Sequence, residues 1–358
     1  MSKITVGLVG AGLLGLTHSF CLKILKDTGL IDLDLVSVYD TEKEKAESLV
    51  QNMGFSKIVK NPLDIFDDKK INTVFIATPT VYHKEYVIAA AHAKKNIFCE
   101  KPLYINLEGS REMTNAVTKA KVRNGVGLVL RYSPTFTFFR GLISQKNTGY
   151  PILASMRDDQ VLPIRGLHHS QWRADVAKSG GGTIIEHSIH DLDLFRYLFG
   201  KPKIVDSELK YLSGKEGIED YARVVMKFPS GMEGILTSLW HDMVTRTSNR
   251  HFEVLYQKLF IATDHDFLGP VEYTCEDGEC VLVTREEVLD YFLKTNGLDT
   301  NHRTFFAGLD YNLIGSYVME DYFFLKSIID GKTFTPNFED AVLAHEIVDE
   351  IYKKQNAI

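Results

Sequence analysis

Apolar and polar residues alternate in blocks along the first third of the chain. Four short blocks rich in Val, Ile, Leu and Phe predict strands buried on both faces of a parallel sheet: 4–12, 33–40, 71–80 and 96–102. Helical patterns separate them, at 16–27, 41–50 and 83–94. Strands that alternate with helices at this spacing predict a doubly wound parallel sheet of the Rossmann type, whose ligand lies beyond the carboxyl ends of the strands.

The pattern changes after about residue 128. Two pairs of strand-like runs, 221–241 and 250–266, predict hairpins, and the first pair is joined by Pro229-Ser230-Gly231. Helical patterns at 316–331 and 338–354 close the chain. We therefore expect two domains, residues 1–128 and residues 129–358, which also suits a length of 358 residues.

A glycine-rich turn joins the first predicted strand to the first predicted helix. Gly10 permits the tight turn, Gly12 permits close approach of a pyrophosphate, and Gly15 permits packing of the helix on the strand. A G-x-G-x-x-G motif between a strand and a helix predicts dinucleotide binding.

The second predicted strand ends in Asp40, 25 residues after Gly15. A carboxylate at this place accepts hydrogen bonds from the ribose hydroxyls and repels a 2′-phosphate, so NAD is favoured over NADP. The alternative is that Asp40 caps the helix predicted at 41–50. Both roles are compatible with each other.

Two charges and a proline follow directly on the apolar strand at 96–99. Glu100, Lys101 and Pro102 stand where a strand of a doubly wound sheet delivers its carboxyl end to the ligand crevice. A solvated turn is the alternative. The position favours Lys101 as a functional residue, with Glu100 holding it and Pro102 fixing the turn.

Four stretches together resemble the Gfo/Idh/MocA family of dehydrogenases: "GAGLLG", "ATPT" followed by His83, "EKPL", and "GGGTIIEHSIHDLDLFRYLFG". The resemblance covers nearly the whole chain. It implies a Rossmann domain followed by an α/β domain with a large open, mainly antiparallel sheet, commonly used for dimer or tetramer contacts. It also implies that Lys101 is the catalytic residue beside the nicotinamide.

The same resemblance implies the residues that bind the cofactor. They are Gly10, Gly12, Leu13, Leu14, Gly15, Asp40, Thr78, Pro79, His83, Glu100 and Lys101.

Gly180 to Gly182 predict a permissive turn, and apolar residues at helical spacing predict one helix from there to about Phe199. Glu186 and His190 are four residues apart and share a face of that helix. Asp193 follows three residues later and is placed to orient the imidazole of His190. By resemblance, His190 is the general acid or base, and Glu186 stands where many family members have aspartate.

Three further positions are candidates for substrate binding. Arg131 ends a predicted strand, 127–131, at the presumed domain junction, and either binds substrate or forms an interdomain ion pair. Trp172 and Arg173 precede the predicted helix and either form a sugar-facing wall or simply pack. A metal site at His187, His190 and Asp191 is disfavoured, because the two histidines point in different directions on a helix and no other ligand has suitable spacing.

Composition excludes several other functions. The net charge is −6 and no basic run is present, which argues against nucleic acid as a partner. No run approaches the roughly 18 apolar residues of a membrane span. The four cysteines are scattered, so neither a disulfide framework nor a zinc site is expected, and a reducing cytoplasm fits best.

The sequence therefore predicts an NAD-dependent oxidoreductase that transfers a hydride to or from a secondary alcohol of a sugar, cyclitol or related polyol. Lys101 and His190 serve the hydride-transfer site, and the protein is expected to be a homodimer or homotetramer. Two alternatives stay open: an NAD-retaining glycosidase or lyase that oxidises its substrate transiently, and a non-enzymatic sensor of dinucleotides. The particular polyol and the direction of the reaction are not fixed by the sequence.

Overall fold

The computed structural model describes residues 3–145, 147–166, 169–246, 248–276, 278–312 and 314–355. These residues form two compact units. The first unit extends up to Leu128 and also includes Tyr317–His345, and the second contains Val129–Ser316 and the residues from Glu346 onward.

The first unit is built on a six-stranded parallel sheet with the order β3-β2-β1-β4-β5-β6. The strands are β1 (Ile4–Val9), β2 (Leu33–Tyr39), β3 (Lys57–Ile58), β4 (Thr73–Ile76), β5 (Asn96–Cys99) and β6 (Asn124–Val126). The predicted Rossmann-type sheet is confirmed. The sequence did not predict β3, which is only two residues long.

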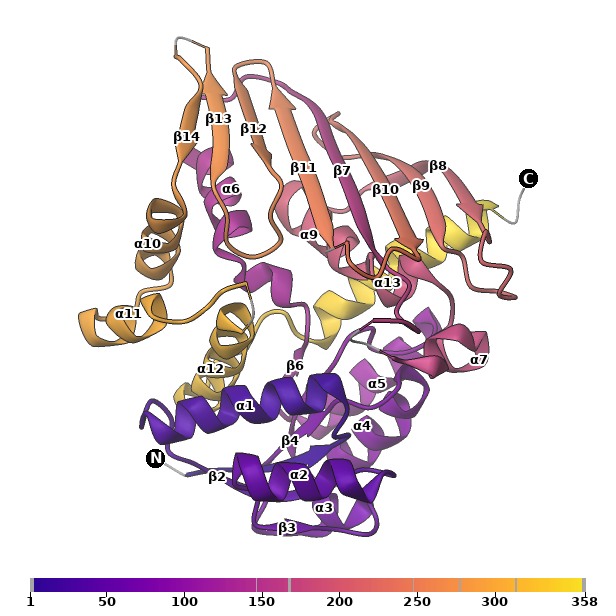
Figure 1. Ribbon diagram of the computed structural model, residues 1–358, viewed down its shortest axis with the longest axis vertical. Helices are drawn as coiled ribbons and strands as arrows, with labels where there is room; N and C mark the ends of the chain where they lie inside the picture. Colours follow the sequence, from indigo (N-terminus) through magenta and orange to yellow (C-terminus); the bar gives the residue numbers. More distant parts are fainter. Residues whose placement is uncertain are drawn as a thin grey trace. The chain divides into compact units, whose positions relative to one another are not determined.

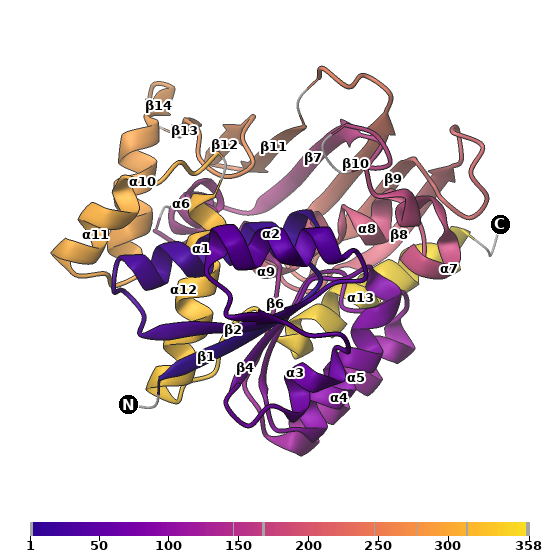
Figure 2. The ribbon, with the colours of Figure 1, turned by 60° about the horizontal axis from the view of Figure 1, so that its bottom comes forward.

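Helices cover both faces of this sheet (Figure 2). They are α1 (Leu13–Asp27), α2 (Lys43–Met53), α3 (Leu63–Asp67), α4 (His83–His92), α5 (Leu107–Ala120), α12 (Gly315–Asp330) and the first part of α13 (Phe338–Gln355), with a short 3₁₀ turn at Thr80–Tyr82. On the face of α1, Phe324 of α12 packs against Phe75 and Phe98. On the opposite face, Val74 and Ile97 share a buried cluster with residues of α4 and α5.

Part of the C-terminal region thus clusters with the first unit. The end of its first stretch at Leu128 coincides with the boundary that the sequence placed near residue 128, whereas Tyr317–His345 fell in the predicted second domain. Backbone hydrogen bonds add to the packing of Phe324. The N–H of Val126 donates to Pro336 O at 3.0 Å, and the N–H of Phe338 donates to the Asn124 side chain at 2.9 Å.

The strand order reverses between β1 and β4. The chain winds from β1 outward to β2 and β3, then returns to β4, β5 and β6 on the other side. In open parallel sheets a ligand binds outside the carboxyl ends of the strands at such a switch point. The glycine turn after β1, the loop after β4 and the Glu100–Lys101 turn after β5 all lie at this edge.

The second unit is built on an eight-stranded sheet with the order β14-β13-β12-β11-β7-β10-β9-β8 (Figure 1). Its strands are β7 (Pro151–Val161), β8 (Lys203–Lys210), β9 (Tyr221–Lys227), β10 (Glu233–His241), β11 (Asn249–Tyr256), β12 (Leu259–Thr263), β13 (Val271–Cys275) and β14 (Val281–Val283). All neighbours are antiparallel except β7 and β10. The large, mainly antiparallel sheet and both predicted hairpins, β9–β10 and β11–β12, are confirmed.

The helices of this unit are α6 (Pro134–Gln145), α7 (Val176–Ser179), α8 (Thr183–Glu186), α9 (Ile189–Phe199), α10 (Arg285–Thr295) and α11 (Thr300–Ala307), with 3₁₀ turns at Val129–Tyr132 and Gln171–Ala174. Phe252 of β11 contacts Phe136 and Phe139 of α6 and Phe195 of α9. Both helices therefore pack on one face of the sheet, as Figure 2 also shows. Among the described helices, none combines the length and apolar composition that a membrane crossing needs.

Buried His345 of α13 gives a testable pH dependence of stability. Burial lowers its pKa from 6.5 to about 3, and its Nε2 has no hydrogen-bond partner among the described residues. Between these two values the unfolded chain binds a proton that the folded chain does not, so His345 costs stability as the pH falls below 6.5. At pH 5 the cost is about 2 kcal/mol, from about 1.4 kcal/mol per pH unit.

His345→Leu removes this titration. Urea unfolding of both proteins between pH 5 and pH 8 should show that the variant gains stability relative to the wild type as the pH falls. A difference that stays constant with pH would contradict a neutral His345.

Candidate active site in two parts

The glycine turn between β1 and α1 has little room for any side chain at two of its positions. Gly10 has φ +97°, and a Cβ there would lie 2.5 Å from Ala77 O. A Cβ on Gly15 would lie 2.0 Å from Gly10 O. A Cβ on Gly12 would meet nothing within 4 Å, so this glycine leaves open space in front of the helix N-terminus.

The N-terminus of α1 suits an anion. Gly12 is its N-cap residue, no side chain caps the helix, and the first turn carries no acidic residue. Backbone N–H groups and the helix dipole at such an end attract phosphate. The first helical residues are Leu13 and Leu14, which the sequence analysis included among the cofactor-binding residues.

Asp40, at the end of β2, is tied to the glycine turn. Its Oδ2 accepts a hydrogen bond from the N–H of Ala11 at 2.6 Å, and its Oδ1 accepts one from the N–H of Glu42 at 2.8 Å. The N-cap residue of α2 is Glu42, two residues later, so the alternative role of Asp40 as the N-cap residue is wrong. The remaining lone pairs of its partly exposed carboxylate suit ribose hydroxyls. The residues present thus fit a dinucleotide.

The loop after β4 contributes Thr78 and Pro79, and His83 begins α4. The Thr78 hydroxyl is buried and has no hydrogen-bond partner among the described residues, which suits a polar ligand at this edge. His83 is buried, with Nε2 2.9 Å from Thr78 O and Nδ1 3.0 Å from Pro102 O. The ring therefore joins the loop after β4 to the turn after β5.

The turn after β5 is fixed by Glu100. The N–H of Glu100 donates to Ile76 O at 2.9 Å, and its carboxylate Oε2 accepts the N–H of Lys101 at 3.0 Å. The buried carboxylate leaves no space for a side chain at position 127, where a Cβ would lie 2.5 Å from Glu100 Oε1. We expected Glu100 to hold Lys101, and the contact that the structure gives is to the lysine backbone. The peptide bond between Lys101 and Pro102 is cis.

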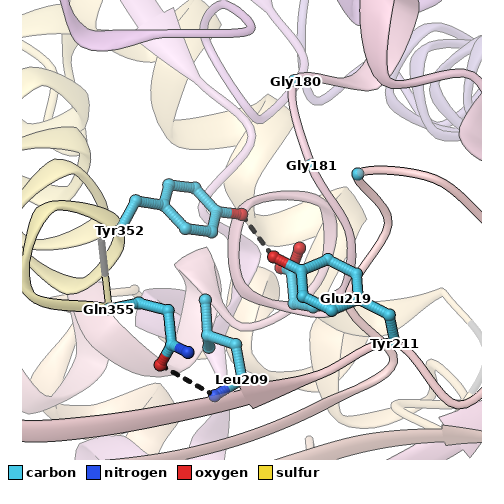
Figure 3. A pocket seen from close by; sticks show the side chains of 8 residues that line it. Gly180, Gly181, Leu209, Tyr211, Glu219, Tyr352 and Gln355 are labelled. Atoms are coloured by element: carbon cyan, nitrogen blue, oxygen red, sulfur yellow. Dashed lines mark hydrogen bonds between the residues drawn. The ribbon is translucent and has the colours of Figure 1, made fainter. Parts of the chain in front are cut away.

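In the second unit, Glu219 anchors the glycine triplet, and Figure 3 shows the hydrogen bond that this carboxylate accepts from Tyr352. Its Oε2 accepts the N–H of Gly182 at 2.8 Å, and its Oε1 accepts the N–H of Ile184 at 3.0 Å and the hydroxyl of Tyr352 at 2.9 Å. A Cβ on Gly182 would lie 1.9 Å from Glu219 O. Burial raises the pKa of the Glu219 carboxyl, and these hydrogen bonds oppose the shift.

The single helix predicted from the glycine triplet to Phe199 is wrong. The segment forms two helices, α8 and α9, with His187 and Ser188 between them. Ser188 donates its backbone N–H to Thr183 O at 2.7 Å, and its hydroxyl lies 2.6 Å from Ser238 Oγ of β10. These two hydrogen bonds fix Ser188 in a non-helical position, so the helix is interrupted between α8 and α9. Glu186 and His190 therefore lie on different helices rather than on one face of the same helix.

His190 occupies the first turn of α9 and is 8% exposed. Glu186 is buried at the end of α8, where its Oε2 accepts a hydrogen bond from Arg173 Nε at 2.9 Å. The guanidinium of Arg173 also stacks over the Trp172 ring, 4.6 Å from its centroid, and donates to Ser170 Oγ. The three predicted residues Trp172, Arg173 and Glu186 are thus brought together.

Arg131 lies in a 3₁₀ turn, not at the end of a strand as we expected. Its Nε and Nη2 each donate to one carboxylate oxygen of Asp193, both at 2.7 Å. Both residues belong to the second unit, so the ion pair is made within one unit. The structure pairs Asp193 with Arg131, whereas the sequence suggested that it orients His190.

A polar cluster that the sequence did not indicate lies beneath the start of α9. Buried Arg250 of β11 donates from Nε to Asp191 at 2.7 Å and lies 3.2 Å from Asp158 and 2.9 Å from Asp266. His187 lies 2.6 Å from Asp158. Burial raises the pKa of Asp158 to about 6 and that of Asp191 to about 7, although Arg250 opposes both shifts. Among the described residues, no three His, Cys, Asp or Glu side chains could hold a metal ion together.

Comparison with protein families matches both units. Residues 4–128 match the oxidoreductase family model with an NAD-binding Rossmann fold, and residues 136–259 match the C-terminal domain model of the same Gfo/Idh/MocA family. Together the two models span most of the chain.

Two curated relatives are inositol dehydrogenases by name. Myo-inositol 2-dehydrogenase of Thermotoga maritima is 29% identical over 240 residues, which cover 64% of this chain and 67% of the relative. Scyllo-inositol 2-dehydrogenase (NAD⁺) of Bacillus subtilis is 31% identical over 245 residues, 65% of this chain and 66% of the relative.

The fold agrees with that of a solved dehydrogenase. Levoglucosan dehydrogenase in complex with NADH and levoglucosan superimposes with a TM-score of 0.85 at 23% identity, over 99% of this chain and 98% of the other. The two family-model matches confirm the resemblance to the Gfo/Idh/MocA family that the sequence showed. The chain belongs to the Gfo/Idh/MocA oxidoreductase family, and its N-terminal part is the NAD-binding Rossmann fold of that family.

Proposed function

We propose that this NAD-dependent oxidoreductase transfers a hydride between the nicotinamide and a secondary alcohol of a sugar, cyclitol or related polyol. The observation that carries the proposal is the shared edge of the first sheet. The glycine turn after β1, Thr78 after β4 and Lys101 after β5 follow three adjacent strands, whose carboxyl ends lie at the switch point of the sheet. The named relatives act on inositols and support a polyol as the substrate.

The cofactor residues have distinct tasks in this proposal. The N-terminus of α1, with Gly12, Leu13 and Leu14, holds the pyrophosphate, and Asp40 accepts the ribose hydroxyls. Gly10 and Gly15 shape the turn, and Thr78, Pro79 and His83 form the wall that follows β4. Bound NAD would supply the nicotinamide ring that accepts the hydride from the alcohol carbon.

The side chains handle the proton and the developing charge. A ring nitrogen of His190 takes the proton of the substrate hydroxyl as the hydride leaves the carbon. The ammonium group of Lys101 donates a hydrogen bond to the same oxygen and stabilises its negative charge, and Glu100 holds the lysine backbone. Four residues contact the polyol and determine which one binds. They are Glu186, which Arg173 orients, together with Arg173, Trp172 and Arg131.

The proposal is tested by absorbance at 340 nm. Purified protein is incubated with NAD or NADP and a panel of sugars, inositols and glycosides, and products are analysed in parallel. NADH that forms in step with one polyol supports the proposal. A glycoside cleaved without net NADH would replace it with redox-assisted cleavage, an alternative that the dehydrogenase names of the relatives do not favour. Tight NAD binding without any turnover would favour a sensor.

Asp40 should determine the choice between NAD and NADP. Asp40→Asn removes the negative charge that repels a 2′-phosphate, and keeps an oxygen that can accept from Ala11 N–H. We expect the ratio of kcat/KM for NADP to that for NAD to rise by about 10- to 100-fold. Each tenfold change corresponds to about 1.4 kcal/mol, and the lost repulsion between a carboxylate and a 2′-phosphate is of this order. Steady-state kinetics with both cofactors measure the ratio, and Asp34→Asn on the same strand is the control. An unchanged ratio would show that Asp40 does not face the ribose.

We further propose a homodimer or homotetramer formed through the open face of the second sheet. On the face opposite Phe252, apolar side chains stay partly exposed, among them Leu153, Ile235 and Leu255. Light scattering after size exclusion measures the subunit number. Leu255→Lys should shift it toward the monomer, and a wild-type monomer would end this proposal.

The cytoplasm is the compartment that we propose. All four cysteines are free thiols, two of them buried, and free thiols suit a reducing environment. Cell fractionation with an antibody against the protein tests this assignment.

A further inference from the structure

A buried histidine of the first unit lies between two carboxylates. His18 on α1 is fully buried, with Nδ1 at 2.9 and 3.0 Å from the two oxygens of Asp321 and Nε2 at 2.9 Å from Glu100 Oε1. Ionised carboxylates only accept hydrogen bonds, so both ring nitrogens donate and the ring is an imidazolium. Burial lowers the pKa of His18, but Asp321 and Glu100 raise it more, so that it lies well above its ordinary value of 6.5.

The surroundings of this triad, His18 with Asp321 and Glu100, are aromatic. Phe98 and Phe75 of the sheet lie 5.1 and 5.5 Å from the His18 ring, and Tyr317 of α12 lies 6.2 Å from it. All three members of the triad are at most 5% exposed. Charge-assisted hydrogen bonds are strong and directional in such an environment, so the triad holds its three elements at a fixed spacing.

The triad continues to the catalytic turn. The oxygen of Glu100 that does not face His18 accepts the backbone N–H of Lys101 at 3.0 Å. Gly127 makes room for this carboxylate, because a Cβ at that position would lie 2.5 Å from Glu100 Oε1. One continuous series of hydrogen bonds thus runs from Asp321 of α12 through His18 of α1 and Glu100 to the backbone of Lys101.

We propose that His18, held by Asp321, is the positioning residue for Lys101. It keeps Glu100 in the one orientation that fixes the lysine backbone, and it links the catalytic turn to α1, the helix whose N-terminus faces the cofactor. A buried ion pair stabilises a fold little compared with apolar side chains of the same volume. Its contribution here is geometry, since a shift of about 1 Å at a reacting group costs on the order of 100-fold in rate.

The inference rests on the proposed function for its kinetic test, so a second test is independent of turnover. His18→Gln roughly keeps the size of the side chain, but both of its N–H donors sit on one nitrogen, so it cannot replace the donors at both ring nitrogens. His345→Gln is the matched control, because His345 is another fully buried histidine of the same unit that lies outside the triad. Melting curves establish that each variant folds.

The kinetic test uses NAD with myo-inositol as the probe polyol. We expect His18→Gln to lower kcat by about 10- to 100-fold, while the KM for myo-inositol and the Kd for NADH stay within about threefold. His345→Gln should leave all three within about threefold of the wild type. A folded His18→Gln protein with unchanged kcat, or an equal loss in His345→Gln, would overturn the inference.

The spectroscopic test uses the holoenzyme with NADH. In protein labelled with ¹⁵N-histidine, the His18 signal, assigned by its loss in His18→Gln, should show two protonated nitrogens at pH 7. In protein whose lysines carry ¹³C-methyl groups, the Lys101 signal, assigned by its loss in Lys101→Arg, should move in His18→Gln and stay in place in His345→Gln. A neutral His18 ring or an unmoved Lys101 signal would overturn the inference.

The outcomes separate the inference from the proposed function. No turnover of any polyol, together with a Lys101 signal that moves only in His18→Gln, rejects the proposed function and supports the positioning role. If the wild type turns over a polyol while His18→Gln leaves both the Lys101 signal and kcat unchanged, the proposed function is supported and the positioning role is rejected. If His18→Gln does not fold, Asp321→Asn takes its place: it keeps the shape and removes the charge, and should move the Lys101 signal and lower kcat at least threefold at pH 8. An unchanged Asp321→Asn would overturn the inference.

Discussion

Lys101→Met should lower kcat by at least about 100-fold. The substitution keeps the apolar stem of the side chain and removes the ammonium group, which is the donor assigned to the substrate oxygen. Groups that stabilise developing charge or move a proton in the transition state contribute about 10²- to 10⁴-fold. Stopped-flow absorbance at 340 nm in a single turnover separates this chemical step from product release.

Lys57→Met is the matched control for this variant. Lys57 lies on β3 of the same sheet, where it pairs with Asp68 at 3.0 Å and is half exposed. An exposed ion pair of this kind contributes at most about 1 kcal/mol, so the control should behave as the wild type. A folded Lys101→Met protein with kcat within about threefold of the wild type would reject the role of Lys101.

A feature could be predicted from the sequence where one short stretch both forms the local structure and carries the functional residues. The glycine turn is such a case, because Gly10, Gly12 and Gly15 shape the backbone that binds the ligand. Glu100 and Lys101 are another, because their place after an apolar strand determines the sheet edge to which they belong. The two hairpins of the second sheet were also predicted, since turn residues and alternation are local signals.

Long-range contacts were beyond a reading of local pattern. Helical periodicity from 183 to 199 is continuous, yet Ser188 bonds to Ser238 of β10 and the helix is interrupted there. Glu219 carried no motif, although it anchors the glycine triplet. The sequence analysis named both Arg131 and Asp193. It could not pair them, because they are 62 positions apart in the sequence and only the fold brings them together.

His18 did leave a signal in the sequence that was not used. Gly15, His18, Leu22 and Leu25 lie on the buried face of α1, so His18 is a titratable residue on an apolar stripe. Such a residue needs a partner. The partner on α12, Asp321, is 303 positions away and no spacing rule connects the two.

His190→Asn should lower kcat/KM by about 10²- to 10³-fold and remove the acid limb of the pH–rate profile. A histidine base works only when it is unprotonated, so the wild-type rate should fall as the pH decreases, whereas asparagine does not titrate. The measurement is kcat/KM for polyol oxidation between pH 5 and pH 9. His302→Asn is the control, because His302 of α11 pairs with Asp299 at 2.7 Å near the surface of the same unit. A variant that keeps the acid limb would show that another group titrates.

The double variant Lys101→Met/His190→Asn then asks whether the two residues serve one substrate oxygen. If they act on the same hydroxyl in the same transition state, removal of one leaves little for the other to contribute, and the losses are strongly non-additive. We expect kcat of the double variant to lie within about tenfold of the poorer single variant. Independent sites would instead multiply the two losses. Non-additivity would show that Lys101 and His190 act in the same chemical step.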